Sequence, residues 1–499
     1  MTPDAIWETA GLPDRRLAGL ALNPAAPEDV LLWILAEGPP AARMGLCRDR
    51  DLPEAVVDAV VTHPDRRTRS FFAGNPHVDP ALRARLVDDP EWLVRAHLAS
   101  GIRLGLDRLP PPLPDWAVAR MITTYEDELL GEFAFIRELS PEFRASMLTH
   151  PEPKIRAYGI GITAWVSLPE GERSALLNDP DERVREQALS AKDRHDHDHD
   201  PSRVEADLPA QAGHYRTHLL LHGALSRTVI EAVLTAPARS GERATIADNH
   251  SLPADIVALL SRDPDPEVRQ LIAMRPDLAM HHLKALAVDP DPSVRLAASQ
   301  HPSLTEAERA AIDYEVSQDG PFRTLWTPAP SKDPEQLRTL ALSAHPLLRR
   351  RAAMAEHLPP DLMARLTDDP DLGVRVLLAQ HQPGVPPGLL LRCFLEYAGR
   401  GRACLPKRPG FPASGLARYA GHEDPAVRRL AARDPELAPG AADRLTRDPD
   451  AGVRDAFARH PRLPLPRVVE LLDDEELTHA AAANPALPVA TMRRLAEGP

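Results

Sequence analysis

The chain contains few cysteines and no long apolar run. Its three cysteines among 499 residues, Cys47, Cys393 and Cys404, are too few and too far apart for a disulfide framework. A reducing, cytoplasmic setting is therefore expected. No stretch reaches the roughly 18 apolar residues of a membrane span, and the first residues lack the basic and apolar regions of a signal peptide. The sequence predicts a protein with no membrane partner.

Motifs of catalysis and cofactor binding are also missing from the sequence. It has no Walker loop, no GxGxxG on a strand–helix turn, no GxSxG and no HExxH. Their absence argues against the nucleotide, dinucleotide, serine-hydrolase and zinc-protease sites that these motifs build. We therefore expect no catalytic residues, no cofactor and no metal site, and a protein that is not an enzyme.

The composition shows instead an acidic, proline-rich chain. Lys and Arg number 59 against 73 Asp and Glu, which gives a net charge of −14. Apolar residues make up 43%, which argues against a disordered chain. Proline occurs 54 times, roughly twice its ordinary share, whereas glycine occurs only 26 times. With so few glycines, the high proline content is not that of collagen or of a flexible linker. The prolines must therefore have another role in the fold.

One pattern recurs along the chain, a proline followed after four residues by an arginine. It occurs at Pro64/Arg69, Pro90/Arg95, Pro151/Arg156, Pro180/Arg185, Pro264/Arg269, Pro290/Arg295, Pro346/Arg351, Pro370/Arg375 and Pro449/Arg454. The distance of 385 residues from Arg69 to Arg454 divides into 14 steps of about 27 residues. Degenerate copies near Arg16, Arg43, Arg216, Arg243, Arg323, Arg402 and Arg428 fill the array. About 18 repeats are therefore expected, and a fixed period of this length is the mark of a repeat protein.

The clearest repeat starts at Asn249 and predicts two short helices. The first follows Pro253, with an apolar face of Ile256, Leu259 and Leu260. The alternation of Asp and Pro from 263 to 266 must interrupt it, because a residue that precedes proline is pushed out of the α region. Asp265 can then cap a second helix that starts at Pro266. Elsewhere an Asn-Pro pair ends the repeat, and we expect its asparagine in the left-handed conformation.

Helices of two turns are unstable alone but can be stabilised by stacking. The sequence therefore predicts an all-α fold, an ARM/HEAT-like α-solenoid superhelix of about 18 two-helix repeats of about 27 residues. A single continuous solenoid is expected over residues 1–499. Irregular repeats are expected at about 100–147, 190–212 and 392–415.

Two motifs give the chain a family resemblance. The Asp-Pro-Asp-x-x-Val-Arg pattern of residues 369–375 and 448–454 and the Asn-Pro-x-Leu-Pro pattern of residues 484–488 resemble the leucine-rich repeat variant family, a branch of the HEAT/armadillo-like solenoids. The founding member of that family carries an iron–sulfur cluster on an N-terminal group of cysteines. Cys47 is the only cysteine before Cys393, so the cluster is not expected here. The resemblance implies protein or ligand binding.

The phased arginines have two interpretations. They could follow a phosphate backbone, or they could link repeats as the similarly spaced Asp and Arg of HEAT-like repeats do. An acidic residue lies six positions before the arginine in six of the nine clear copies. A half-buried guanidinium needs such a partner, and the net charge of −14 also favours the structural ladder.

Two irregular segments precede the middle of the chain. Between 100 and 147, the runs from Arg108 to Trp116 and from Tyr125 to Phe135 mix acidic and aromatic residues, which predicts either an enlarged core around a longer helix or an aromatic groove for a peptide. The run from His195 to Asp200 alternates His and Asp where a turn is expected. We interpret it as a solvated loop, with adventitious binding of divalent metal as the alternative.

The third irregular segment is our candidate for partner binding. Arg400, Arg402, Lys407 and Arg408 lie close together between aromatic residues, in a basic part of an acidic chain. Such a loop could hold an acidic protein or RNA, or it could be an exposed, degenerate repeat.

The sequence as a whole predicts a non-catalytic scaffold for protein–protein interaction. The alternative is a nucleic-acid-binding protein resembling the HEAT-like alkylpurine DNA glycosylases, and a more remote one is an enzyme resembling the HEAT-repeat bilin lyases. The net charge of −14 disfavours nucleic acid.

Overall fold

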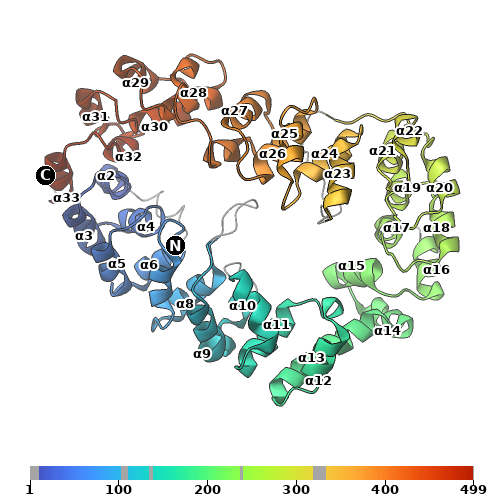
Figure 1. The fold of residues 1–499 in the computed structure, drawn as a ribbon. Helices are drawn as coiled ribbons and strands as arrows, with labels where there is room; N and C mark the ends of the chain where they lie inside the picture. Colours follow the sequence, from blue (N-terminus) through green and yellow to red (C-terminus); the bar gives the residue numbers. More distant parts are fainter. Residues whose placement is uncertain (1–10, 103–110, 134–138, 237–239, 318–332, 498–499) are drawn as a thin grey trace. The chain divides into compact units, whose positions relative to one another are not determined.

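The computed structural model describes residues 11–102, 111–133, 139–236, 240–317 and 333–497. In these ranges all regular secondary structure is helical and no strand occurs (Figure 1). The predicted all-α helical-repeat solenoid is thereby confirmed. Arg108, Phe135 and Arg323 lie outside the described residues. None of the described helices is long and apolar enough to cross a membrane.

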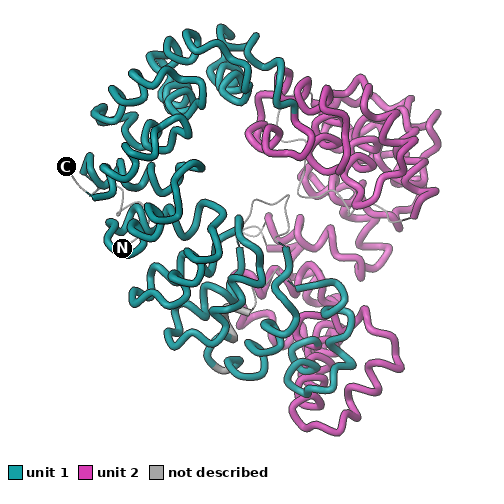
Figure 2. The backbone as a smooth tube through the Cα atoms, turned by 60° about the vertical axis from the view of Figure 1, so that its left-hand side comes forward, with its two compact units in different colours: residues 1–159, 412–499 teal, residues 160–411 magenta. Residues whose placement is uncertain are grey.

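The chain forms two compact units, residues 1–159 with 412–499 and residues 160–411 (Figure 2). The first unit contains α2 (Leu12–Ala21), α3 (Glu28–Glu37), α4 (Pro40–Arg48), α5 (Glu54–Val61), α6 (Arg66–Ala73), α7 (Pro80–Arg83), η1 (Ala84–Leu86), α8 (Trp92–Ser100), α9 (Asp115–Phe133), α10 (Pro141–Ser146), η2 (Met147–Thr149) and most of α11 (Pro153–Ile162). Its C-terminal part adds η6 (Ala417–Tyr419), α28 (Pro425–Leu430), η7 (Ala431–Arg433), α29 (Pro439–Leu445), α30 (Ala451–Ala458), α31 (Leu465–Leu471), α32 (Thr478–Ala482) and α33 (Val489–Glu497).

The second unit continues the same alternation of short helices. It contains η3 (Trp165–Ser167), α12 (Glu170–Leu177), α13 (Glu182–Asp198), α14 (Pro201–Asp207), η4 (Leu208–Ala210), α15 (Gly213–His222), α16 (Arg227–Thr235), α17 (Ser240–Ala247), α18 (Ala254–Leu260), α19 (Pro266–Ala273), α20 (Met280–Leu286), α21 (Pro292–Ser299), α22 (Glu306–Ala310), α23 (Pro334–Leu342), α24 (Pro346–Ala353), α25 (Pro360–Thr367), α26 (Leu372–His381), α27 (Pro387–Glu396) and η5 (Arg402–Lys407).

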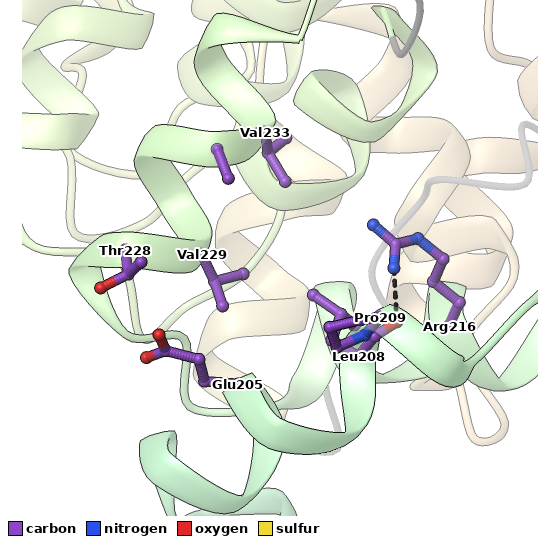
Figure 3. A pocket seen from close by; sticks show the side chains of 8 residues that line it. Glu205, Leu208, Pro209, Arg216, Thr228, Val229 and Val233 are labelled. Carbon is purple, nitrogen blue, oxygen red and sulfur yellow. Dashed lines mark hydrogen bonds between the residues drawn. The ribbon is translucent and has the colours of Figure 1, made fainter.

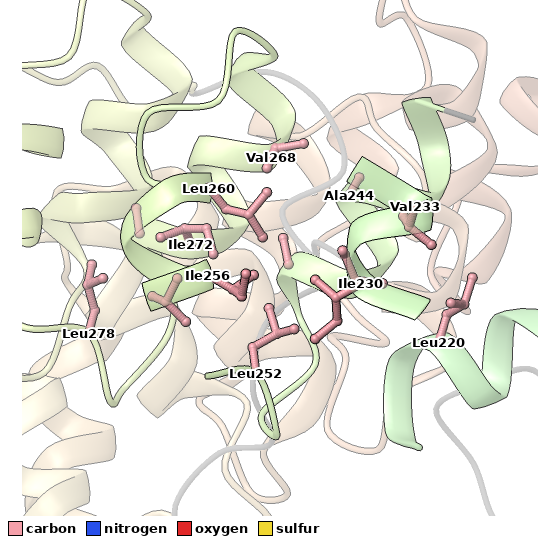
Figure 4. Packing of buried hydrophobic residues seen from close by; sticks show 14 of the residues in the cluster. Leu220, Ile230, Val233, Ala244, Leu252, Ile256, Leu260, Val268, Ile272 and Leu278 are labelled. Atoms are coloured by element: carbon pink, nitrogen blue, oxygen red, sulfur yellow. The ribbon is translucent and has the colours of Figure 1, made fainter. Parts of the chain in front are cut away.

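The repeat that starts at Asn249 forms as its sequence predicts. Asp265 caps α19 by accepting a hydrogen bond from the amide of Glu267, and Pro266 occupies the first helical turn. Val268 and Ile272 of this helix are fully buried. They belong to an apolar cluster that runs without interruption through several repeats (Figure 4). Neighbouring repeats therefore supply the core that one pair of short helices cannot form alone.

The helices of each unit form two layers. In the first unit α2, α4, α6 and α8 pack successively on one another, and α3 packs on α5 in the other layer. In the second unit α15, α17, α19 and α21 form one such row (Figure 1). The helices α16, α18 and α20 of the second layer each pack on the helix that follows them in sequence.

The phased arginines form a ladder between repeats. Arg269 donates from Nε and Nη2 to Asp289 in the next repeat, at 2.8 and 2.9 Å, and from Nη1 to the carbonyl of Asp263 at 2.7 Å. The same pairing across 20 residues joins Arg69 to Asp89, Arg349 to Asp369 and Arg428 to Asp448. The acid six positions before an arginine thus offers its carbonyl to its own repeat and its carboxylate to the repeat before it.

One predicted member of the ladder is wrong. Arg349 rather than Arg351 takes the position in α24, because it donates to both carboxylate oxygens of Asp369 and to the carbonyl of Ser343. Pro346 is the first residue of α24 and corresponds to Pro266 of α19. The arginine of the ladder therefore lies three residues after Pro346. Arg351 is half-buried, and its loss of contact with water lowers its pKa.

The asparagines that end repeats do not adopt the expected left-handed conformation. Among the described residues only glycines have positive φ. The Asn249 side chain instead donates to the carbonyls of Leu220 and Gly223 in the preceding repeat, at 2.9 and 2.8 Å. Its Oδ1 accepts a hydrogen bond from the amide of Ser251. Asparagine is therefore used because its amide satisfies buried carbonyls across the repeat boundary.

The first and last repeats of the chain make this same contact with each other. Asn23 donates to the carbonyls of Ala482 and Asn484, at 2.8 and 2.7 Å. Asn484 in turn donates to the carbonyls of Ala458 and His460, its neighbours in the preceding repeat. The repeat contact thus continues from the end of the chain to its beginning.

Charged and close-packed contacts complete this terminal junction. Arg16 donates to the carbonyl of Leu472 at 2.7 Å and pairs with Asp473, and Arg493 pairs with Asp29 at 2.7 Å. The helices α2 and α32 approach so closely that a Cβ on Gly19 would lie 2.1 Å from the carbonyl oxygen of His479. A glycine is required at this position because the obstacle is backbone.

Replacement of Arg269 by alanine should lower the free energy of unfolding by about 2 kcal/mol. Burial of Asp289 opposes its ionisation, but the hydrogen bonds from Arg269 and from the amide of Asp291 lower its pKa. Without the arginine the charge of Asp289 loses a partner. Urea titration checks the effect, and exposed Arg262 in the same repeat provides the control. Arg262→Ala should change stability by less than about 0.5 kcal/mol.

The substitution Gly19→Ala should separate the two ends of the chain. Hydrogen exchange should then become faster in α2 and α32, because the added methyl group cannot coexist with the His479 carbonyl at 2.1 Å. Gly171→Ala in α12 is the control, since a Cβ there meets no atom within 4 Å. Unchanged exchange in α2 and α32 of the Gly19 variant would contradict the packing of the junction.

Candidate functional site

The predicted basic segment divides into two structural and two exposed cations. Arg402 donates from Nε to the carbonyl of Phe394 at 2.7 Å, and its guanidinium lies 4.5 Å from the centre of the Phe394 ring. Arg408 donates from Nη2 to the carbonyl of Gln382 at 2.6 Å. Both side chains are half-buried and fasten the segment to α26 and α27. Their charges are therefore not freely offered to a partner.

The other two cations of this segment point toward solvent. Arg400 and Lys407 are exposed. A turn after the end of α27 leads into this segment. The Tyr397 hydroxyl stabilises the turn by donating to the Arg400 carbonyl at 2.7 Å. Gly401 follows with a φ of 92°, a conformation that suits glycine. The structure thus brings all four cations onto one segment but leaves only Arg400 and Lys407 accessible.

The segment at 100–147 contains the expected longer helix. Helix α9 has 19 residues and packs on α8. Tyr125 of α9 lies under the Arg95 guanidinium, 4.6 Å from it, and donates to Asp88 at 2.9 Å. Burial, followed by the hydrogen bond to Asp88, raises the pKa of Tyr125. Trp92 donates to the carbonyl of Glu128 at 3.0 Å. These aromatic side chains tie the two helices together.

The run from His195 to Asp200 is not the predicted loop. Helix α13 continues to Asp198, and Asp200 caps α14 through the amide of Ser202. Burial opposes protonation of His197, but Asp207 at 2.9 Å and Asp198 at 3.3 Å outweigh it and raise its pKa. In the described part of the chain no group of three or more His, Cys, Asp or Glu residues could hold a metal ion.

The sequence did not reveal a pocket of about 390 Å³ beside this segment. It lies in the second unit, where Leu208 and Pro209 of η4 face Val229 and Val233 of α16 (Figure 3). Leu208, Val229 and Val233 are buried and belong to the apolar cluster of the second unit. The η4 side of the pocket falls in the irregular repeat predicted at 190–212, which includes the end of α13. With 17 residues, α13 is longer than the other described helices of the second unit.

Polar groups border this apolar pocket on two sides. Arg216 is neutralised, because it donates to both carboxylate oxygens of Glu242, at 2.8 and 3.1 Å, and to the carbonyl of Leu208 at 2.6 Å. The hydrogen bonds to Glu242 raise the pKa of Arg216. On the other side are the Glu205 carboxylate and the Thr228 hydroxyl, which bind no other side chain in the described ranges (Figure 3). The pocket thus combines an apolar wall with one available negative charge.

Comparisons with known proteins leave the family of the chain open. No family model and no curated protein sequence matches it. Among solved structures, that of an engineered protein is similar over 94% of this chain and 93% of its own, with 14% sequence identity and a TM-score of 0.11. A superposition with this TM-score does not establish a shared arrangement of helices.

Two double variants should separate the structural cations from the exposed ones. Arg402→Glu with Arg408→Glu should lower the free energy of unfolding by about 2 kcal/mol or more, because two half-buried carbonyls lose their donors. Arg400→Glu with Lys407→Glu makes the same charge change and should leave it within about 0.5 kcal/mol. Urea denaturation of each double variant beside the native chain measures both changes. Equal loss of stability in the two variants would contradict the division.

Proposed function

We propose that the chain is a non-catalytic scaffold that binds proteins, and that the pocket between η4 and α16 is one of its binding sites. The observation that carries the proposal is the internal use of the phased arginines. Arg69, Arg269, Arg349 and Arg428 keep only 9–13% of their side chains exposed, each against a carboxylate. Cations neutralised in this way are not available to a phosphate backbone, so protein is the favoured partner over nucleic acid.

The chemistry of the pocket suggests what kind of segment it takes. Leu208, Pro209, Val229 and Val233 offer an apolar wall to a side chain such as leucine or methionine. Glu205 has no cation among the described residues and can pair with one from the partner. We therefore infer a preference for a peptide in which an apolar residue lies next to lysine or arginine.

The repeat architecture supports this role. Solenoids bind partners through extended surfaces and through departures from the regular repeat, and the pocket lies at such a departure. The resemblance to the leucine-rich repeat variant family agrees with a binding function. Arg400 and Lys407 are exposed cations on another irregular segment and provide a candidate contact for acidic residues of a partner.

Peptide selection against the full chain tests the proposal. We expect enriched peptides with an apolar residue beside a cation, and we expect Ala232→Trp to weaken their binding about tenfold or more by filling the pocket. Ala232 is exposed, so the variant should fold. Ala285→Trp, at an exposed position of α20, is the matched control and should bind as the native chain does. Fluorescence anisotropy gives the affinities.

Two further arms distinguish the alternatives. Glu205→Lys should weaken the binding of peptides that carry a cation and leave the binding of neutral apolar peptides unchanged. A DNA duplex and a single-stranded RNA should show no binding at physiological ionic strength. Tight nucleic-acid binding together with no peptide selection would overturn the proposal.

A further inference from the structure

Arg43 lacks the carboxylate that Arg69, Arg269, Arg349 and Arg428 each find in the next repeat. Arg43 occupies the ladder position of α4, three residues after Pro40 at the start of that helix, as Arg269 does after Pro266. Twenty residues after Arg43 the sequence has His63, where Asp89 and Asp289 serve Arg69 and Arg269. At this position of the repeat the sequence therefore has a histidine in place of the aspartate that pairs with the arginine.

The imidazole of His63 does not replace the missing carboxylate. Its Nε2 lies 3.1 Å from the carbonyl oxygen of Leu35, and its Nδ1 accepts a hydrogen bond from the amide of Asp65. The nearest carboxylate oxygen to Arg43 belongs to Asp65, at 3.9 Å. That carboxylate already accepts hydrogen bonds from the Arg67 amide and the Thr68 hydroxyl, both at 3.0 Å. The Arg43 Nε is buried and has no hydrogen-bond partner.

A pocket of about 350 Å³ opens beside this arginine, between α4 and α6. Three arginines line it, Arg43, Arg66 and Arg67, against the single carboxylate of Asp65. The Arg67 side chain is exposed and binds no other side chain among the described residues. Arg66 meets Glu91 at 3.2 Å, but both side chains are about half exposed, so that pair is weak and can rearrange.

We infer that this pocket binds a doubly charged oxyanion of the phosphate monoester type. Guanidinium groups bind such oxygens in pairs and at fixed geometry. An anion there would supply Arg43 with the acceptors that Asp289 supplies to Arg269, and would compensate a side chain that is only 21% exposed. The inference is independent of the proposed peptide pocket, which lies in the other unit.

The anion can come from two sources, free phosphate or a phosphorylated side chain of a partner. Both present the same dianion to the three arginines. Inorganic phosphate and a peptide with one phosphoserine, beside its unphosphorylated form, distinguish them. Stronger binding of the phosphopeptide than of phosphate indicates a protein source, and equal binding indicates the free ion. The unphosphorylated peptide should not bind.

The decisive variant restores the regular ladder. His63→Asp gives Arg43 a carboxylate at the position where Arg69 and Arg269 have one, so it should weaken phosphate binding about tenfold or more without lowering the melting temperature. Arg67→Glu changes only an exposed side chain and should weaken binding to a similar extent. Arg444→Glu makes the same charge change at an exposed position of α29 in the same unit and is the control.

Calorimetry on the full chain measures binding, and thermal unfolding with and without phosphate measures the coupled stabilisation. Binding should decrease as ionic strength rises. The inference is overturned if the native chain neither binds phosphate nor is stabilised by it, or if His63→Asp binds as the native chain does. An equal loss in Arg444→Glu would also overturn it, since that result would reflect net charge rather than the pocket.

Discussion

The arginine that joins each repeat to the next is the interaction on which the rest of this structure depends. Its guanidinium has donors on two edges, and the repeat uses both. In Arg69, Arg269, Arg349 and Arg428 one edge bonds to the carbonyl six residues earlier, and the other bonds to the aspartate 20 residues later. One side chain therefore sets the internal geometry of its repeat and its register with the next. The apolar cluster of the second unit extends through the successive repeats that Arg269 joins.

A solenoid usually exposes an apolar face at each end and needs special repeats to cover it. In the first unit the two ends cover each other, because Asn23 binds the carbonyls of Ala482 and Asn484 as internal asparagines bind their own neighbours. The helices α2 and α32 therefore pack on each other as the helices of neighbouring repeats do. The close approach at Gly19 shows that this junction is as tightly packed as an internal helix contact.

Local patterns in the sequence predicted what depends on local physics. The Asp265 cap, the start of α19 at Pro266 and the pairing of arginines with acids all follow from residue types at fixed spacing. Features that depend on contacts between distant residues could not be predicted. The partner of Asn23 is 459 residues away. The sequence also does not tell whether Pro346 corresponds to Pro264 or to Pro266 of the clearest repeat, and this decides whether Arg351 or Arg349 belongs to the ladder. The pocket beside Val229 is a space between η4 and α16, and no residue pattern announces such a space. That Arg43 has no such aspartate could be recognised only after the structure showed that the partner lies 20 residues after the arginine.

The junction between the first and last repeats changes what a break in the backbone would mean. In an open array of repeats, a protease that cuts between two of them produces two pieces that are free to separate. Here residues 1–159 and 412–499 belong to one compact unit. Cleavage at any loop between them would leave both fragments carrying half of a shared core, still fastened by Asn23 and by the pairs of Arg16 and Arg493. The protein would be nicked without being divided, and gel electrophoresis under denaturing conditions would detect the damage before size exclusion did.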